Sequence, residues 1–128
     1  GDFAAFNTRV FEVDRMVMEG EAIERAEQNQ VRWIIDNTRR NVLIDGWVVP
    51  MCNAPKAFAS DVGNRLVMRG PFSATYYDTV DARIFSLRSD ANNPLCVDVS
   101  EIAKRYGGGG HKHAAGFSVP RNHSLGIA

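Results

Sequence analysis

The fold class is decided by the stretch Val42-Leu43-Ile44-Asp45-Gly46-Trp47-Val48-Val49. Two apolar runs rich in β-branched residues flank an Asp-Gly pair, which favours the left-handed backbone of a tight hairpin turn. We therefore expect two antiparallel strands, at 42–44 and 47–49. Pro50 follows directly and has no backbone donor, so we expect the second strand either to lie close to a sheet edge or to carry an irregularity.

Upstream of this hairpin, the spacing of the apolar residues changes from that of a strand to that of a helix. Residues spaced four, three and four positions apart mark one apolar face: Phe6, Val10, Val13 and Val17. This spacing predicts a helix, and no proline interrupts residues 8–37. We expect a helical segment over about 1–39 that leads into an α/β core over 41–119, followed by a loose tail over 120–128.

Downstream of the hairpin, helices and strands alternate. Ser60 predicts the cap of a short helix, with Asp61 in its first turn, and Gly70 ends that helix. Phe72–Asp78 and Ala82–Ser89 are β-rich and close together, which favours an antiparallel pair.

The last third of the chain adds one more capped helix and a final strand. Asp98 and Glu101 predict a capping box, and Gly107 fits the left-handed position that ends the helix. We expect a further helical turn at 111–115 and a strand at 117–119. Hairpins and helical crossovers both occur, so we predict one α/β domain with a mixed, roughly five-stranded sheet flanked by helices.

Composition excludes several classes of protein. The chain has 128 residues, zero formal net charge and 45% hydrophobic residues, which is typical of a globular domain. No apolar run reaches the ~20 residues of a membrane span, and the start lacks a signal peptide. We therefore expect a cytoplasmic protein with no membrane partner, in which Cys52 and Cys96 are buried, reduced thiols. Basic groups exceed acidic ones by three over residues 82–128, which suits a few phosphates better than duplex DNA.

Four glycines, Gly107 to Gly110, carry the strongest chemical signal. A backbone without Cβ atoms can approach a ligand closely, and successive free amides form an anion-binding nest. The helical turn expected next would add its partial positive charge, and His111 and Lys112 would donate from side chains. These features predict a phosphate-binding loop.

Other readings of this loop fit less well. A Walker loop needs Gly-Lys-Ser/Thr at its end, but His111-Lys112-His113 stands there. A flexible linker is disfavoured because a capped helix and an apolar strand flank the glycines. His111 and His113 supply only half of a metal site, and we expect no metal in this chain.

Residues 105–117, RYGGGGHKHAAGF, closely resemble the GGGH-x-x-AAG-F signature of the DHH-associated C-terminal domain. That domain is the second half of DHH-family phosphoesterases, which include RecJ-like exonucleases and short-oligonucleotide ribonucleases with pAp phosphatase activity. Segments 85–89 and 98–103 resemble the family just upstream of the signature, and 53–55 and 59–63 fit weaker patterns. The resemblance covers about residues 10–119.

The resemblance implies a substrate-binding domain that grips the phosphate of a nucleotide or short single-stranded nucleic acid. The phosphate-binding residues would be Gly108, Gly109, Gly110, His111, Arg88 and Lys112. Asn53, Ser60 and Asp61 are weaker pocket candidates, because turn formation and helix capping already explain them.

The sequence departs from the family in one large respect, because it contains no Asp-His-His motif. In the family, that motif belongs to a domain holding two manganese ions, which activate water for hydrolysis. We therefore expect no catalytic residue or cofactor in this chain and no hydrolase activity of its own. The resemblance implies a parent chain whose DHH catalytic domain is its partner, and a homodimer formed through that parent.

Two functions of other classes remain open. One is an RNA-contacting or tRNA-contacting tethering module, as in alanyl-tRNA synthetases. The other is an independent metalloenzyme that uses His111 and His113. The residues do not distinguish RNA, DNA, pAp, a cyclic dinucleotide or polyphosphate as the substrate of the parent.

Overall fold

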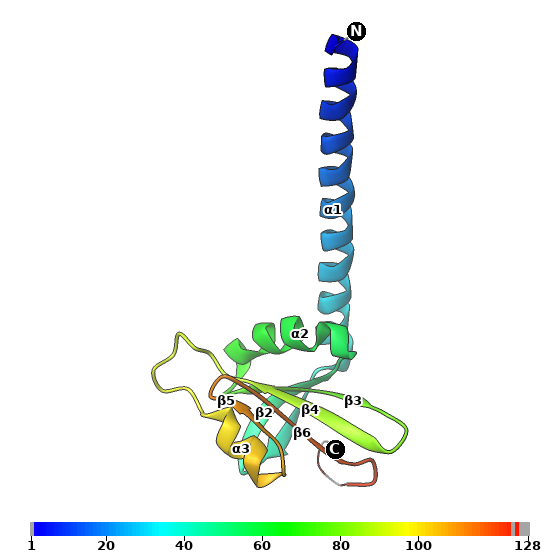
Figure 1. Ribbon diagram of the computed structural model, residues 1–128. Helices are drawn as coiled ribbons and strands as arrows, with labels where there is room; N and C mark the ends of the chain where they lie inside the picture. Colours follow the sequence, from blue (N-terminus) through cyan, green and yellow to red (C-terminus); the bar gives the residue numbers. More distant parts are fainter. Residues whose placement is uncertain (1, 124, 126–128) are drawn as a thin grey trace. The chain divides into compact units, whose positions relative to one another are not determined.

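The computed structural model describes residues 2–123 and 125, with side chains from residue 16 onward. The chain divides into two compact units, Gly1–Arg32 and Trp33–Ala128. The first unit belongs to the long helix α1, and the second contains the sheet and the shorter helices (Figure 1).

Helix α1 spans Asp2–Thr38, so the predicted helical segment is present. The expected apolar face is only partly observable, because three of its residues lie outside the described side chains: Phe6, Val10 and Val13. Its fourth residue, Val17, is 54% exposed. The side chains at 16–27 are all exposed, so tertiary packing does not account for this part of the helix.

The predicted hairpin is confirmed. Strand β1 (Arg40–Ile44) pairs antiparallel with strand β2 (Trp47–Asn53). Asp45 and Gly46 both have positive φ, 51° and 84°, which is the turn that matches the twist of a two-residue hairpin. Pro50 lies opposite Asn41 of the edge strand β1, so β2 is next to a sheet edge, as predicted.

The chain then passes through a short turn η1 (Lys56–Phe58), helix α2 (Ala59–Leu66) and a second turn η2 (Val67–Arg69). The predicted capping role of Ser60 is wrong, because Phe58 occupies the N-cap and no side chain caps the helix. The turn η1 runs directly into α2, and the Ala59 amide donates to the Lys56 carbonyl. Ser60 and Asp61 are exposed in the first turn.

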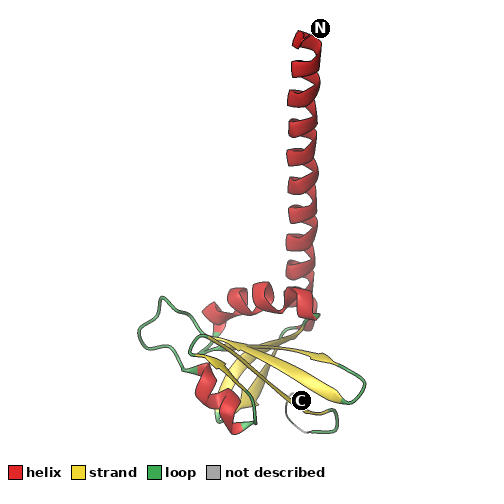
Figure 2. Ribbon diagram, in the orientation of Figure 1, coloured by secondary structure: helices red, strands yellow, loops and turns green. Residues whose placement is uncertain are grey.

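Strands β3 (Ser73–Asp78) and β4 (Ala82–Arg88) form the predicted antiparallel pair. Strand β3 also pairs parallel with β2, and α2 lies on the crossover between them. A mixed sheet therefore forms, as Figure 2 shows.

Helix α3 (Val99–Arg105) has Asp98 at its N-cap, as predicted, and the Ser100 amide donates to Asp98 Oδ1 over 3.0 Å. The predicted helical turn at 111–115 is wrong. Gly109–His111 form strand β5, which pairs with strand β6 (Ala114–Pro120) across the turn at Lys112 and His113. Ala115 packs against the core, so alternation along β6 favours a strand over a helix there.

The sheet has six strands in the order β1-β2-β3-β4-β6-β5. The predicted mixed α/β class is confirmed, with β5 as the strand beyond the expected five. The hydroxyl of Ser73 donates to Gly63 of α2, so α2 covers the face that carries Ser73. The opposite face packs on α3, where the Phe117 ring stacks between Phe85 and Tyr106, at centroid distances of 4.9 and 4.7 Å.

The tail differs in part from the prediction. Leu125 is buried in the core cluster, and its amide donates to His123 Nδ1 over 3.0 Å. The tail is therefore packed at Leu125, because burying an apolar side chain away from water lowers the free energy of the folded state. Residues 124 and 126–128 lie outside the described part.

Candidate functional site

The glycine run begins as the end of helix α3. Gly107 has a φ of 85°, and its amide donates to the Lys104 carbonyl over 3.0 Å. The Gly108 amide donates to the Ala103 carbonyl over 2.8 Å. This pair of bonds is the Schellman arrangement that closes a helix. The expected nest of free amides is therefore wrong at Gly107 and Gly108, because the helix end uses both donors.

The rest of the run is an edge strand. Gly109, Gly110 and His111 lie in β5, opposite Gly116, Ala115 and Ala114 of β6. No helix N-terminus follows within the described residues, so the expected contribution of a helix dipole is absent here. Strand β5 has one neighbour in the sheet, and alternate amides of an edge strand face outward.

Close packing explains two of these glycines. A Cβ on Gly108 would lie 2.6 Å from Phe117 Cβ and would also meet the Gly116 carbonyl. A Cβ on Gly110 would lie 2.6 Å from Ala115 Cα. A Cβ on Gly109 would meet nothing within 4 Å. Gly107 and Gly109 are therefore the members of the run that border open space, and of these two only Gly109 lies in β5.

The sheet register brings Arg88 and His111 into one row. Ala114 of β6 lies opposite Arg88 of β4 on one side and opposite His111 of β5 on the other. Directly opposed residues of antiparallel strands share a face, so the two side chains stand on the same face, about 10 Å apart at their Cα atoms. The residue between them is an alanine, whose short side chain is partly buried.

The neighbouring row on the same face is also small. Ser86, Gly116 and Gly109 lie side by side two residues further along their strands. Small residues therefore occupy this face of β6 and β5 beside the row of Arg88 and His111.

The aliphatic part of the Arg88 side chain is packed against α2, whereas its guanidinium has no ion-pair partner among the described residues. A Cβ on Gly63 would lie 2.9 Å from Arg88 Cγ, so the missing Cβ of Gly63 lets the arginine pass under α2. Within the described part of the chain, no carboxylate forms an ion pair with the Arg88 guanidinium. An unpaired guanidinium retains its full donor fork for an anion.

Lys112 lies in the turn after His111, with an exposed side chain. Its charge is one of the influences that lower the pKa of Asp98; the largest is the hydrogen bond from the Ser100 hydroxyl. The Lys112 carbonyl accepts bonds from the Val99 amide, at 3.0 Å, and the Ser89 hydroxyl, at 3.2 Å. The backbone of Lys112 therefore anchors the turn that follows His111.

The side chain of His113 has defined contacts in the structure, whereas the sequence pattern indicated only half of a metal site for it. Its Nδ1 atom lies 3.1 Å from Ser89 Oγ and 3.6 Å from Cys96 Sγ. The partners are 24 and 17 residues away in sequence, and no local motif links them. Only the fold could bring these three groups together.

The weaker pocket candidates do not join this site. Asn53 ends β2, and its amide donates to the Thr38 hydroxyl over 3.2 Å. Among the described residues, no hydrogen bond or ion pair links Asn53, Ser60 or Asp61 to Arg88 or His111. Their proposed role as pocket residues remains a prediction.

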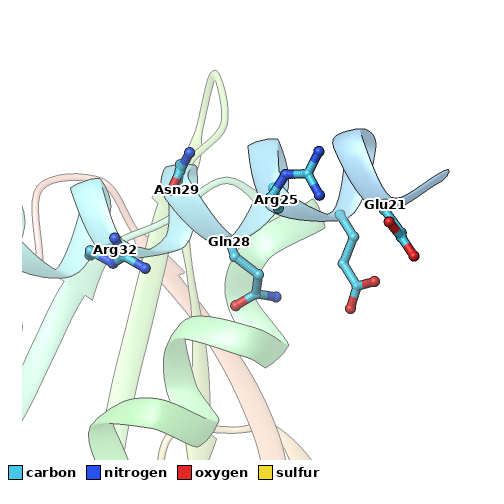
Figure 3. A pocket seen from close by; sticks show the side chains of 6 residues that line it. Glu21, Arg25, Gln28, Asn29 and Arg32 are labelled. Atoms are coloured by element: carbon cyan, nitrogen blue, oxygen red, sulfur yellow. The ribbon is translucent and has the colours of Figure 1, made fainter. Parts of the chain in front are cut away.

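Helix α1 carries a hollow of its own, of about 400 Å³. It is lined by Glu21, Glu24, Arg25, Gln28, Asn29 and Arg32, which project from successive turns of that one helix (Figure 3). Two acidic and two basic groups line it, so their formal charges cancel and the hollow has no net preference for an anion.

Neither clustered metal ligands nor a membrane-crossing helix occurs in the part of the chain that the structure describes. Among those residues, no group of three or more His, Cys, Asp or Glu side chains could hold a metal ion. Within the same part, no helix combines the length and apolar character that crossing a bilayer requires.

The comparisons with known proteins give the class of fold first. The structure resembles a solved pGpG-specific phosphodiesterase, PggH from Vibrio cholerae, with a TM-score of 0.60 and 14% identity, over 82% of this chain and 37% of that chain. At this identity, the likeness establishes a shared fold. This chain therefore shares the fold of part of that phosphodiesterase.

In sequence, the chain is similar to an uncharacterized protein, R106, of Acanthamoeba polyphaga mimivirus. The two are 37% identical over 91 residues, which make up 67% of this chain and 20% of the viral protein. The chain thus spans about a fifth of the length of that relative. No protein-family model matches the chain.

Proposed function

We propose that this chain is the substrate-binding domain of a DHH-family phosphoesterase and that it holds the phosphate of a nucleotide or short single-stranded nucleic acid. One observation carries the proposal: Arg88 and His111 border Ala114 on one face of the sheet, and the guanidinium has no carboxylate partner among the described residues.

The chemistry of this row suits a phosphate monoester or diester. Arg88 offers a planar donor fork that matches two phosphate oxygens. His111 is exposed and adds a ring donor from the other side. Outward amides of the edge strand at 109–111 take the place of the nest expected from the sequence, and Lys112 adds charge at the turn.

The comparisons add context to this proposal. The fold neighbour is a phosphodiesterase specific for pGpG, and a phosphate on the Arg88 row fits a domain from that class of enzyme. Because the chain spans 37% of that neighbour, we assign hydrolysis to the rest of a longer parent. The same proposal includes four properties of that parent: two manganese ions, a DHH partner domain, a homodimer and a cytoplasmic location.

A titration of the full chain with a 5′-phosphorylated dinucleotide, followed by amide NMR, tests the proposal. We expect shifts at 86–88 and 109–116. Arg88→Ala and His111→Ala should each weaken binding about tenfold, since a charge-assisted hydrogen bond contributes roughly 1.5–3 kcal/mol. Lys104→Ala is the matched control, because Lys104 is exposed on α3 and pairs with Glu101.

Two outcomes would contradict the proposal. One is equal affinity for the dinucleotide with and without its 5′-phosphate, which would remove the phosphate from recognition. The other is preferential retention of a structured tRNA over the dinucleotide, which would favour the tethering function.

A further inference from the structure

A cavity of about 260 Å³ lies among the start of β2, the turn η2 with the residues after it, and the loop at 90–97. Apolar side chains line part of it, and Gly70, Asp90, Asn93 and Cys96 line the rest. The apolar lining consists of Trp47, Val67, Met68, Pro71, Leu95 and Val97. A volume of this size admits a small molecule and excludes a large one.

The loop that carries Cys96 is held by its own hydrogen bonds. The Asn93 amide donates to the Asp90 carbonyl, and the Cys96 amide donates to the Asn93 carbonyl, both over 3.1 Å. The Leu95 amide donates to Asn93 Oδ1 over 3.0 Å. These bonds hold the Cys96 thiol in place beside the cavity.

The backbone at His113 is also held by hydrogen bonds. The Ser89 amide donates to the His113 carbonyl over 3.1 Å, and the Val99 amide anchors the preceding residue, Lys112. His113 Nδ1 then lies 3.6 Å from Cys96 Sγ, which is within reach for proton transfer from the thiol.

The hydrogen bonds of Ser89 indicate which arrangement of protons satisfies the groups around His113 Nδ1. Its single hydroxyl proton reaches the Lys112 carbonyl at 3.2 Å, and its oxygen lies 3.1 Å from His113 Nδ1. When the thiol proton has moved to Nδ1, that N–H faces the sulfur and the Ser89 oxygen, while the Ser89 hydroxyl still donates to Lys112. The Nδ1 proton and the Ser89 hydroxyl proton then each have an acceptor.

We propose that Cys96 and His113 form a nucleophilic thiol–imidazole pair and that Cys96 is a covalent modification site for small electrophiles that enter the cavity. The inference does not depend on the proposed phosphate site. With iodoacetamide, the sulfur–carbon bond forms as the carbon–iodine bond breaks. Iodide leaves with the bonding electrons, and the thiol proton passes to Nδ1 and then to buffer.

The chain has one other cysteine, which serves as an internal reference. Cys52 is fully buried, and this burial raises the pKa of its thiol. Alkylation of the full chain, followed by peptide mass spectrometry, should label Cys96 before Cys52. Exposure alone would also give that order, so variants of the imidazole are needed.

His113→Asn should slow alkylation of Cys96 by about a hundredfold, the lower end of the usual contribution of a positioned base. His123→Asn is the matched control, because that imidazole binds the Leu125 amide, and its rate should equal that of the unchanged chain. Circular dichroism shows whether each variant is folded. Equal Cys96 rates in folded wild type and His113→Asn would overturn the proposal.

The size of the electrophile gives a second test, which needs no variant. A dye-sized iodoacetamide should label Cys96 of the folded chain more slowly than iodoacetamide does. In urea, the two reagents should label Cys96 at the same rate. Equal labelling rates in the folded chain would refute entry through the cavity.

Discussion

Gly108 and Gly109 are neighbours in the sequence, but the fold gives them opposite environments. Gly108 lies against β6, where a Cβ would be 2.6 Å from Phe117 Cβ. A Cβ on Gly109 would meet no atom within 4 Å, and this glycine lies beside the Arg88 row. One glycine therefore serves packing, and the other borders the proposed ligand.

Alanine substitutions should separate these two roles. Gly108→Ala should lower the free energy of unfolding by about 3 kcal/mol, because the backbone of β6 cannot move aside. Gly109→Ala should change it by about 0.5 kcal/mol or less. Urea denaturation of both variants measures the difference, and equal destabilisation would contradict the packing described for Gly108.

At the scale of the elements, an ion pair links the end of β3 to the start of β4, next to the turn of their hairpin. Arg83 donates to Asp78 through Nε at 2.8 Å and through a terminal nitrogen at 3.1 Å. The guanidinium also lies 4.4 Å from the centre of the Tyr76 ring. The hydrogen bond from Arg83 is the main influence that lowers the pKa of the Asp78 carboxyl.

This ion pair predicts a pH dependence of stability. A carboxyl whose pKa is lower in the folded state stabilises the fold above its unfolded pKa, and the gain is lost as pH falls through the folded pKa. Asp78→Asn should therefore destabilise the chain at neutral pH and reduce the loss of stability on acidification. Thermal unfolding between pH 7 and pH 2 measures both effects, with the exposed Asp36→Asn as the control; equal acid sensitivity in Asp78→Asn and wild type would contradict this account.

The elements themselves followed from local patterns to different degrees. The Asp-Gly hairpin and the Asp98 cap are correct because their turn chemistry involves adjacent residues. The helical turn expected at 111–115 is wrong because pairing with β6 outweighs the local preference of those residues. Ser60 was expected to cap α2, but the preceding turn η1 begins the helix without it.

At the scale of the whole molecule, the two compact units call for a test of independence. The described side chains of α1 at 16–27 are exposed, so they bury little apolar surface. Removal of residues 1–28 should lower the Tm by about 3 °C or less, since a shift of 4–8 °C corresponds to about 1 kcal/mol in a domain of this size. A loss of the cooperative transition, measured by calorimetry, would show that the sheet unit needs the helix.

The α/β class, the first hairpin and the capped helix could be predicted from the sequence alone. These features depend on turn chemistry, caps and apolar periodicity, which act between residues close together in the chain. Only the tertiary structure decided that Gly107 and Gly108 use their amides in a helix end, that Ala114 separates Arg88 from His111, and that Cys96 meets His113. Strand order and register set those contacts, and they depend on packing between segments that no local pattern connects.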